Sequence, residues 1–300
     1  MKRYLCCVIL AVLTCVYGCR KKEETPTSGE RLLLAADPYL PLMQQEIEQF
    51  MSIYPDVKMT VRGASTREAI VLMLNDSVQS IVVNRQFNEE EQQIIKQASL
   101  KIVENKIAED GIAIIVHRQN PIANISIESA RKIAAGEAKK WNQVPESGRT
   151  GYIELVLTDK NSGMYELLQK KIFSISEDLK PAVVMPDQDE VIKFVSANPK
   201  SIGFVASSLA NADKGQVKIV PVLVKSQDGI EKSYMPQQEE IYNRLYPFHF
   251  SLYLYNAESK ASVGIGFSAQ VLSNIGQKII QNAGLVPASI PYRIIQLNAE

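Results

Sequence analysis

The chain has 300 residues, of which 46% are hydrophobic and 22% are charged, and its 33 basic residues equal its 33 acidic residues in number. This balance excludes the strongly basic face that nucleic-acid binding requires, and the length is sufficient for a large hydrophobic core. All four cysteines lie at or before Cys19, so no disulfide can form within the body of the chain. The fold must therefore depend on its core.

The N-terminal segment up to Cys19 has the organisation of a bacterial export signal. Two basic residues precede an uncharged apolar run over 4–17, which is shorter than the roughly 20 residues of a membrane-spanning helix and suits a signal segment. Val16-Tyr17-Gly18-Cys19 resembles the lipobox of bacterial lipoproteins. We predict a removable signal peptide over 1–18, a membrane anchor of acyl chains such as palmitate on Cys19, and a flexible polar tether over 19–30. The alternative is a short anchor that is never cleaved.

After the tether, short β-rich runs alternate with amphipathic stretches, which favours an α/β fold with a largely parallel sheet. Apolar runs rich in β-branched residues predict the strands, and apolar residues at helical spacing predict the helices. The predicted strands cover 31–35, 57–61, 80–83, 111–116, 153–157, 201–205, 217–222 and 250–255. The predicted helices cover 39–54, 67–75, 89–98, 127–136, 164–173 and 268–281.

Two of these helices begin directly after strands and carry recognisable starts. Asp37-Pro38 has an N-cap residue followed by a proline at the first helical position. Ser65-Thr66-Arg67-Glu68 fits a capping box. Helix N-termini offer free N–H groups to anions, and ligands of parallel α/β sheets bind where such helices begin. Each cap can equally serve only to stop its helix from fraying.

Four blocks of sequence occur in the order found in one known family. The segment GIAIIVHRQNPIANISIESARKIAAGEAKKWNQV (111–144) resembles the phosphate-binding proteins of bacterial phosphate importers, in which an apolar strand leads to an Asn-Pro turn, a helix, a Gly and a Trp-Asn pair. VIKFVSANPKSIGFV (191–205), SLYLY (251–255) and VLSNIGQKIIQNAGLVP (271–287) are similar to the family's later helix, return strand and closing helix.

The resemblance implies a two-lobed periplasmic binding protein fold of the type II-like class, with a mixed, mostly parallel sheet flanked by helices in each lobe. We place lobe 1 at 31–114 and 252–300 and lobe 2 at 115–251. Crossings between the lobes are expected near 112–116 and 247–254. The ligand would lie between the lobes and be enclosed when they close.

The resemblance also suggests ligand-binding residues, although the family's anion signature is incomplete. The family has an Arg, three residues and then Ser-Gly-Thr, whereas this chain has Thr158 in place of the Arg, keeps Ser162 and Gly163, and has Met164 in place of the Thr. Ser65 and Thr66 match a second loop. Arg85 is our candidate for the missing cation, with a surface ion pair to Glu89 or Glu90 as the alternative. Asp37 is the candidate acceptor for a protonated phosphate, or only a helix cap.

Other chemistry has weaker support in the sequence. Ser129-Ala130-Arg131-Lys132 matches a Ser-x-x-Lys pattern, but the partner motifs of penicillin-recognising enzymes and the Gly-x-Ser-x-Gly motif are absent. The only two histidines, His117 and His249, lack neighbouring ligands for a transition metal. We therefore predict no enzyme activity, no cofactor and no metal site.

Three functions follow as hypotheses. The first is a solute-binding lipoprotein of the bacterial cell envelope that captures phosphate or a related oxyanion for an ABC permease. The second is a membrane-displayed interaction or sensing module of the same fold that has lost phosphate binding, which the residues Thr158 and Met164 motivate. The third is a hydrolase that uses Ser129 or Ser162. A test of ligand binding would separate the first two.

Overall fold

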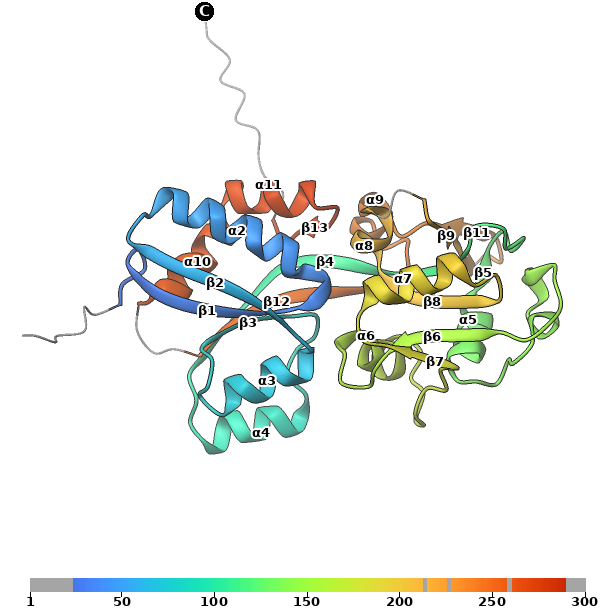
Figure 1. Ribbon diagram of the computed structural model, residues 1–300, viewed down its shortest axis with the longest axis horizontal. Coiled ribbons are helices and arrows are strands. Elements are labelled where there is room, and N and C mark those ends of the chain that lie inside the picture. The colour runs from blue at the N-terminus through green and yellow to red at the C-terminus, as the bar shows by residue number, and fades with distance from the viewer. Residues whose placement is uncertain (1–23, 213–214, 226–227, 258–260, 290–300) are drawn as a thin grey trace, which may run out of the picture.

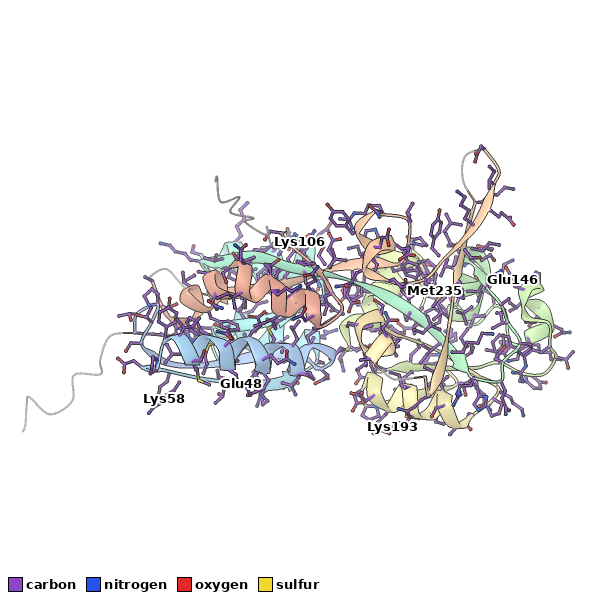
Figure 2. The ribbon with its side chains drawn as sticks, turned by 90° about the horizontal axis from the view of Figure 1, so that it is seen from above. Glu48, Lys58, Lys106, Glu146, Lys193 and Met235 are labelled. Atoms are coloured by element: carbon purple, nitrogen blue, oxygen red, sulfur yellow. The ribbon has the colours of Figure 1, made fainter. Side chains whose placement is uncertain are left out.

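The computed structural model describes residues 24–212, 215–225, 228–257 and 261–289. It has two halves, which lie side by side along the long axis of the molecule (Figure 1). A view turned by 90° keeps them apart, with Glu48 and Lys58 on one half and Glu146 and Lys193 on the other (Figure 2). The predicted signal peptide and Cys19 lie outside the described residues. In the described part of the chain, no helix is long and apolar enough to cross a membrane.

The first half is built on three parallel strands. β1 (Gly29–Ala36) lies between β2 (Val57–Ala64) and β3 (Ser80–Val83) and pairs with both in parallel. The helices that accompany these strands are η1 (Asp37–Tyr39), α2 (Leu40–Ile53), α3 (Thr66–Leu74) and α4 (Glu89–Gln97), joined by α10 (Val263–Val271) and α11 (Asn274–Asn282) from the end of the chain. The parallel strands direct the loops after β1, β2 and β3 to the same end of the sheet, which faces the second half (Figure 1).

Two long strands join the halves. In β4 (Ile102–His117), residues 102–111 pair antiparallel with β12 (His249–Ala257), whereas 112–116 pair with β8 (Ser201–Ala206) and 114–117 with β9 (Val217–Val220). Here β4 is longer than the predicted strand over 111–116. Its first part, IVENKIAED, carries too many charges to be recognised as a strand by its apolar pattern.

A buried carboxylate lies where β4 passes from one half to the other. Asp110 accepts hydrogen bonds from the hydroxyls of Ser207 (2.6 Å), Ser208 (2.6 Å) and Tyr39 (3.2 Å) and from the backbone N–H of Gly111 (2.7 Å). Ser207 and Ser208 begin α8 (Ser207–Ala212) of the second half, while Tyr39 belongs to η1 of the first. The donors allow Asp110 to be fully buried without an unmet polar group.

The second half continues the same sheet, with the strand order β4-β8-β6-β7. β6 (Glu154–Thr158) is parallel to both β8 and β7 (Val183–Met185). A smaller sheet contains β5 (Ile125–Ser126), β10 (Val222–Lys225) and β11 (Glu231–Tyr234). The remaining elements are α5 (Ile127–Ala134), η2 (Trp141–Gln143), η3 (Pro145–Ser147), α6 (Gly163–Glu166), the π-helical turn η4 (Leu167–Ile172), α7 (Gln188–Ala197), α9 (Gln238–Tyr242) and β13 (Val286–Pro287), which pairs with β4 in the first half.

Other predicted elements also differ from those in the structure. The helix predicted over 268–281 is two helices, α10 and α11, because Ser273 caps a new helix through its contact with the N–H of Gly276. The strand predicted over 217–222 is interrupted at Pro221, which cannot donate to a sheet. Residues 24–30 of the predicted tether pack on the body: Glu24 binds the buried Arg31 at 2.6 Å, and Gly29 begins β1.

Candidate functional site

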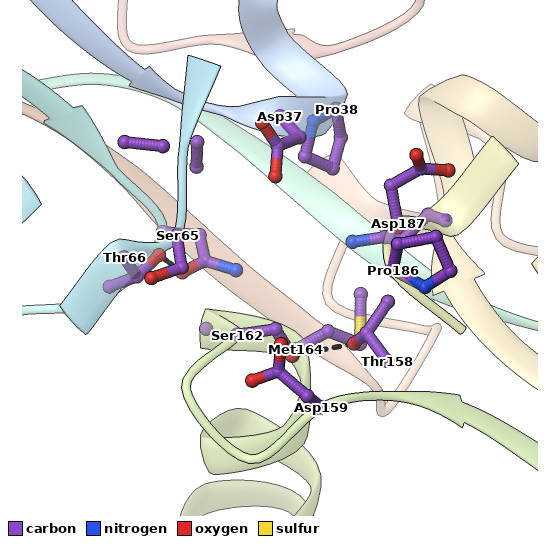
Figure 3. Close-up of a pocket in the computed structure, with 15 residues that line it drawn as sticks. Asp37, Pro38, Ser65, Thr66, Thr158, Asp159, Ser162, Met164, Pro186 and Asp187 are labelled. Carbon is purple, nitrogen blue, oxygen red and sulfur yellow. Dashed lines mark hydrogen bonds between the residues drawn. The ribbon is translucent and has the colours of Figure 1, made fainter. Parts of the chain in front are cut away.

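A small cavity lies between the two halves, at the end of the parallel strands of each. Its volume is about 40 Å³, roughly three times what a single water molecule requires. Figure 3 shows Asp37, Ser65 and Thr66 reaching it from the first half and Thr158, Ser162 and Asp187 from the second. The full lining is Ala36, Asp37, Pro38, Ala64, Ser65, Thr66, Asn84, Thr158, Asp159, Ser162, Gly163, Met164, Pro186, Asp187 and Gln188.

Three helices begin at this cavity, each with a side-chain cap. The hydroxyl of Ser65 accepts from the N–H of Glu68 at the start of α3 (3.2 Å), and that of Ser162 accepts from Tyr165 N–H at the start of α6 (3.2 Å). The carboxylate of Asp187 caps α7 by accepting from Glu190 N–H (2.8 Å). The cavity therefore faces the partial positive charge of several helix N-termini, an arrangement that favours an anion.

Asp37 also lines the cavity, but it is not the N-cap predicted from the sequence. The 3₁₀ turn η1 begins at Asp37 itself, its N-cap is Ala36, and no side-chain cap bond is present there. The carboxylate lies against Gly63, where a Cβ atom would come within 2.6 Å of Oδ1. Partial desolvation raises the pKa of Asp37 above its ordinary value, and the negative charges of Asp187, Glu68 and Asp159 raise it further.

Asn84 provides a buried amide at the cavity. Its Oδ1 accepts a hydrogen bond from the hydroxyl of Thr66 (3.0 Å), and only 3% of the residue is exposed. Among the described residues its Nδ2 has no hydrogen-bond partner, so this donor remains available to a ligand in the cavity. Gly163 of the second half approaches so closely that a Cβ atom there would lie 1.8 Å from Asn84 Oδ1 and 2.5 Å from Thr66 Oγ1.

The cavity lining carries three carboxylates, those of Asp37, Asp159 and Asp187, and none of the residues that form it in the described chain is a lysine or an arginine. Two of these carboxylates are already bound to backbone N–H groups: Asp187 caps α7, and Asp159 accepts from Asn161 N–H at 2.6 Å. Asp37 is the carboxylate with the raised pKa. The groups of the described lining that can donate to an anion are therefore backbone N–H groups and uncharged side chains.

Arg85, the predicted cation, lies outside the cavity lining. Its guanidinium donates to both carboxylate oxygens of Glu91 (2.7 and 2.8 Å) and forms an ion pair with Glu166 of the second half, with 2.5 Å between Nε and Oε2. Its partners are therefore not the Glu89 and Glu90 of the alternative prediction. The structure thus brings together Asp37, Ser65, Thr66, Ser162 and Gly163, and it places Arg85 beside them.

The residues of the weaker hypotheses have structural partners. The hydroxyl of Ser129 donates to the carboxylate of Glu146 (2.9 Å) within the second half, and neither residue lines the cavity. Ser162 shares a 2.5 Å hydrogen bond with Thr158 and has no histidine or lysine beside it in the cavity lining of the described chain. Across the described ranges, no group of three or more His, Cys, Asp or Glu side chains could hold a metal ion.

Comparison with known proteins identifies the family. A model described as a PBP superfamily domain matches residues 21–274. The chain belongs to the PBP superfamily. Protein SphX of Synechococcus elongatus is 24% identical over 271 residues, covering 87% of this chain and 79% of the relative. The phosphate-binding protein PstS of Staphylococcus saprophyticus is 25% identical over 250 residues, covering 82% and 76%. These relatives confirm the family resemblance predicted from the sequence.

Solved structures confirm the PBP fold. A phosphate ABC transporter substrate-binding protein from Clostridium perfringens, solved with bound phosphate, has a TM-score of 0.75 at 22% identity and covers 87% of this chain and 100% of its own. An ABC-type phosphate transport receptor from Vibrio cholerae has a TM-score of 0.68 at 20% identity, with 86% and 100% covered.

Several polar residues that line the cavity were not predicted as ligand-binding residues, among them Asn84, Asp159, Asp187 and Gln188. The sequence does carry a signal for Asp187. Pro186-Asp187 lies between a strand and a helix, as Asp37-Pro38 does, with the order of the proline and the aspartate exchanged. Asn84 carries no charge, and its neighbour Arg85 fitted the missing cation of the family signature, so the sequence pointed to the arginine at this loop.

Proposed function

We propose that this protein captures inorganic phosphate, or a closely related oxyanion, between its two halves and presents it to an ABC permease. The observation that carries the proposal is the convergence of the N-termini of α3, α6 and α7 on one small cavity. Its small volume suits a compact ion. The names of the SphX and PstS relatives support phosphate in particular.

In this proposal the ligand is held by hydrogen bonds alone, with no covalent chemistry. The hydroxyls of Ser65 and Ser162, the amide Nδ2 of Asn84 and the backbone N–H of Gly163 are the donors for the oxyanion. The Thr66 hydroxyl donates to Asn84 Oδ1 and so orients the amide. Asp37 accepts a hydrogen bond from the hydroxyl group of a phosphate that retains a proton. Sulfate has no such hydroxyl group at neutral pH. Because its pKa is raised, acidification neutralises Asp37, and so relieves its repulsion of an anion, at a higher pH than for an ordinary aspartate.

We further propose that the two halves are the hinged lobes of the PBP fold, with lobe 1 at 31–114 and 252–300 and lobe 2 at 115–251. The continuous strands β4 and β12 supply the hinge. Donors from both lobes line the cavity, so opening would separate Ser65, Thr66 and Asn84 from Ser162 and Gly163. Ligand affinity is then coupled to closure.

We propose that Cys19 carries the lipid anchor, after removal of 1–18, and that the body is displayed from a bacterial membrane in the cell envelope. The support is the sequence pattern from Met1 to Cys19. Detergent partitioning of the full-length protein expressed in bacteria, compared with Cys19→Ser, tests this. A wild-type protein that stays in the aqueous phase and has no added acyl mass would contradict the anchor.

Calorimetric titration tests the ligand. The protein lacking residues 1–19, stripped of ligand by unfolding and refolding, is titrated with phosphate and then with sulfate. We expect micromolar or tighter phosphate binding, about −8 kcal/mol or more negative, with no heat from sulfate.

Two N-cap serines offer a matched pair of variants for the same titration. Ser65→Ala removes a cap at the cavity, and Ser273→Ala removes a similar cap at α11, away from it. Only Ser65→Ala should weaken phosphate binding. If no oxyanion gives heat or a thermal shift, phosphate capture is wrong for this protein.

A further inference from the structure

Arg85 forms an ion-pair bridge between the halves, just outside the cavity. It follows β3 in the first half, and only 10% of its side chain is exposed. Its partner Glu166 ends α6 in the second half, and 20% of that side chain is exposed. Partly buried ion pairs are screened by salt less than surface pairs, so salt should weaken this contact less than it weakens an ordinary surface ion pair.

The first half holds the guanidinium of Arg85 in place. Glu91 receives two hydrogen bonds from it, and the Glu91 carboxylate also accepts from the N–H of Asn88 in the capping box of α4. The backbone carbonyl of Gln86 accepts a further hydrogen bond at 2.9 Å. Burial alone would lower the pKa of Arg85, but Glu91 and Glu166 raise it above its ordinary value, so the charge is permanent.

The second half connects Glu166 directly to the ligand cavity. α6 begins with Gly163, which lines the cavity, and Glu166 lies one helical turn later. The approach that forms the Arg85–Glu166 pair is also the approach that seats Gly163 against Asn84 and Thr66. Beside it, the N–H of Arg67 donates across the same boundary to the carbonyl of Asn161 (3.4 Å).

We propose that Arg85 and Glu166 are positioning residues that set the closed arrangement of the ligand site without touching the ligand. The Arg85–Glu166 pair attracts the two halves to each other even without a ligand. Part of the free energy of closure therefore comes from the protein and not from the oxyanion. This proposal extends the phosphate-capture function proposed above, but the closing role of the pair does not depend on which ligand the cavity takes.

The experiment compares Glu166→Gln with Lys170→Gln in the protein lacking residues 1–19. Lys170 is the other partner of Glu166, at 3.1 Å, and it lies in the same half, so its loss leaves the bridge between the halves intact. Small-angle X-ray scattering of the ligand-stripped proteins reports closure. We expect Glu166→Gln to have a larger radius of gyration than the wild type, and Lys170→Gln to match the wild type.

Phosphate titration of the same proteins gives the second readout. Coupling between a conformational equilibrium and a ligand is typically 5- to 150-fold, and we expect Glu166→Gln to weaken phosphate binding by roughly 5- to 20-fold and Lys170→Gln by less than about twofold. Arg85→Gln combined with Glu166→Gln should lose about as much affinity as Glu166→Gln alone, because both changes break the same contact between the halves. The other partners of Arg85, Glu91 and Gln86, lie in its own half.

The two readouts separate failure of this proposal from failure of the proposed function. If the ligand-stripped Glu166→Gln protein is as compact as the wild type, the positioning role is wrong, whatever the phosphate affinity. If the wild type binds no phosphate but Glu166→Gln is expanded, phosphate capture is wrong and the closing role of the pair stands.

Discussion

Gly163 lies where the first turn of α6 approaches Asn84 and Thr66 of the other half, and a methyl group there would collide with both. We expect Gly163→Ala to weaken phosphate binding at least tenfold, about 1.4 kcal/mol, because the halves cannot reach their present separation. Calorimetric titration measures the loss. Alanine is the better helix former, so thermal unfolding should be unimpaired. Wild-type affinity in this variant would mean that the site does not need the close approach.

Asp37 makes phosphate binding depend on pH through its own charge. Its pKa is raised, so on acidification it loses its negative charge at a higher pH than an ordinary aspartate. The carboxylates of Asp187, Glu68 and Asp159 face it and disfavour its ionised form. We expect Asp37→Asn to bind phosphate differently from the wild type at pH 8, with the ratio of the two dissociation constants approaching one as the pH falls towards 4.

The ratio cancels the titration of phosphate in free solution, which is the same for both proteins, and leaves what depends on the side chain at position 37. Calorimetric titrations of both proteins at several pH values between 4 and 8 provide it. A ratio that does not change with pH would show that Asp37 is neutral, or without influence, throughout this range.

At the scale of the elements, α2 carries a buried carboxyl group that makes the fold less stable as the pH rises. Glu46 is fully buried on the face of α2 that packs on the core, and within the described part of the chain neither of its carboxylate oxygens has a hydrogen-bond partner. Burial raises its pKa from 4.5 to about 8. The folded protein therefore keeps a proton that the unfolded chain releases, and stability falls as the pH rises from about 4.5 to about 8.

Glu46→Gln removes this cost while keeping the shape of the side chain. We expect the variant to be more stable than the wild type by on the order of 3 kcal/mol at pH 7, with the gain disappearing below about pH 4. Urea unfolding at pH 4 and pH 7 measures the difference. Glu48→Gln, on the exposed face of the same helix, is the control and should change little. Equal stabilities of Glu46→Gln and wild type at pH 7 would mean that Glu46 finds a partner in solution.

The helices also show which element boundaries local sequence can predict. Ser65 caps α3 as its pattern indicated, because a cap depends on residues three positions apart. The helix predicted over 164–173 begins at Gly163, one residue early, but becomes π-helical from Leu167. That change depends on how the segment packs in the second half, which its apolar spacing does not reveal.

For the whole molecule, one hydrophobic core extends through both halves. A single cluster of buried side chains includes Leu33 and Phe50 of the first half and Trp141 and Leu155 of the second. β4 and β12 run through it, and Asp110 ties η1 to α8. The halves therefore share part of their interior.

This shared core predicts that the two halves unfold together. Differential scanning calorimetry of the protein lacking residues 1–19 should show one transition. Saturating phosphate should move this transition as a whole to a higher temperature. At one hundred times the dissociation constant, phosphate raises the free energy of unfolding by about 2.7 kcal/mol. Two transitions, of which phosphate shifts only one, would show that the halves are independent folding units.

The sequence by itself determined the family, the α/β class and most of the strands and helices, because apolar periodicity, caps and family blocks are all local patterns. It also located five residues that line the cavity, since Asp37, Ser65, Thr66, Ser162 and Gly163 each lie where a strand gives way to a helix. Only the tertiary structure decided the partner of Arg85. A guanidinium pairs with whichever carboxylate lies nearest in space, and Glu166 is remote from Arg85 along the chain and belongs to the other half of the molecule.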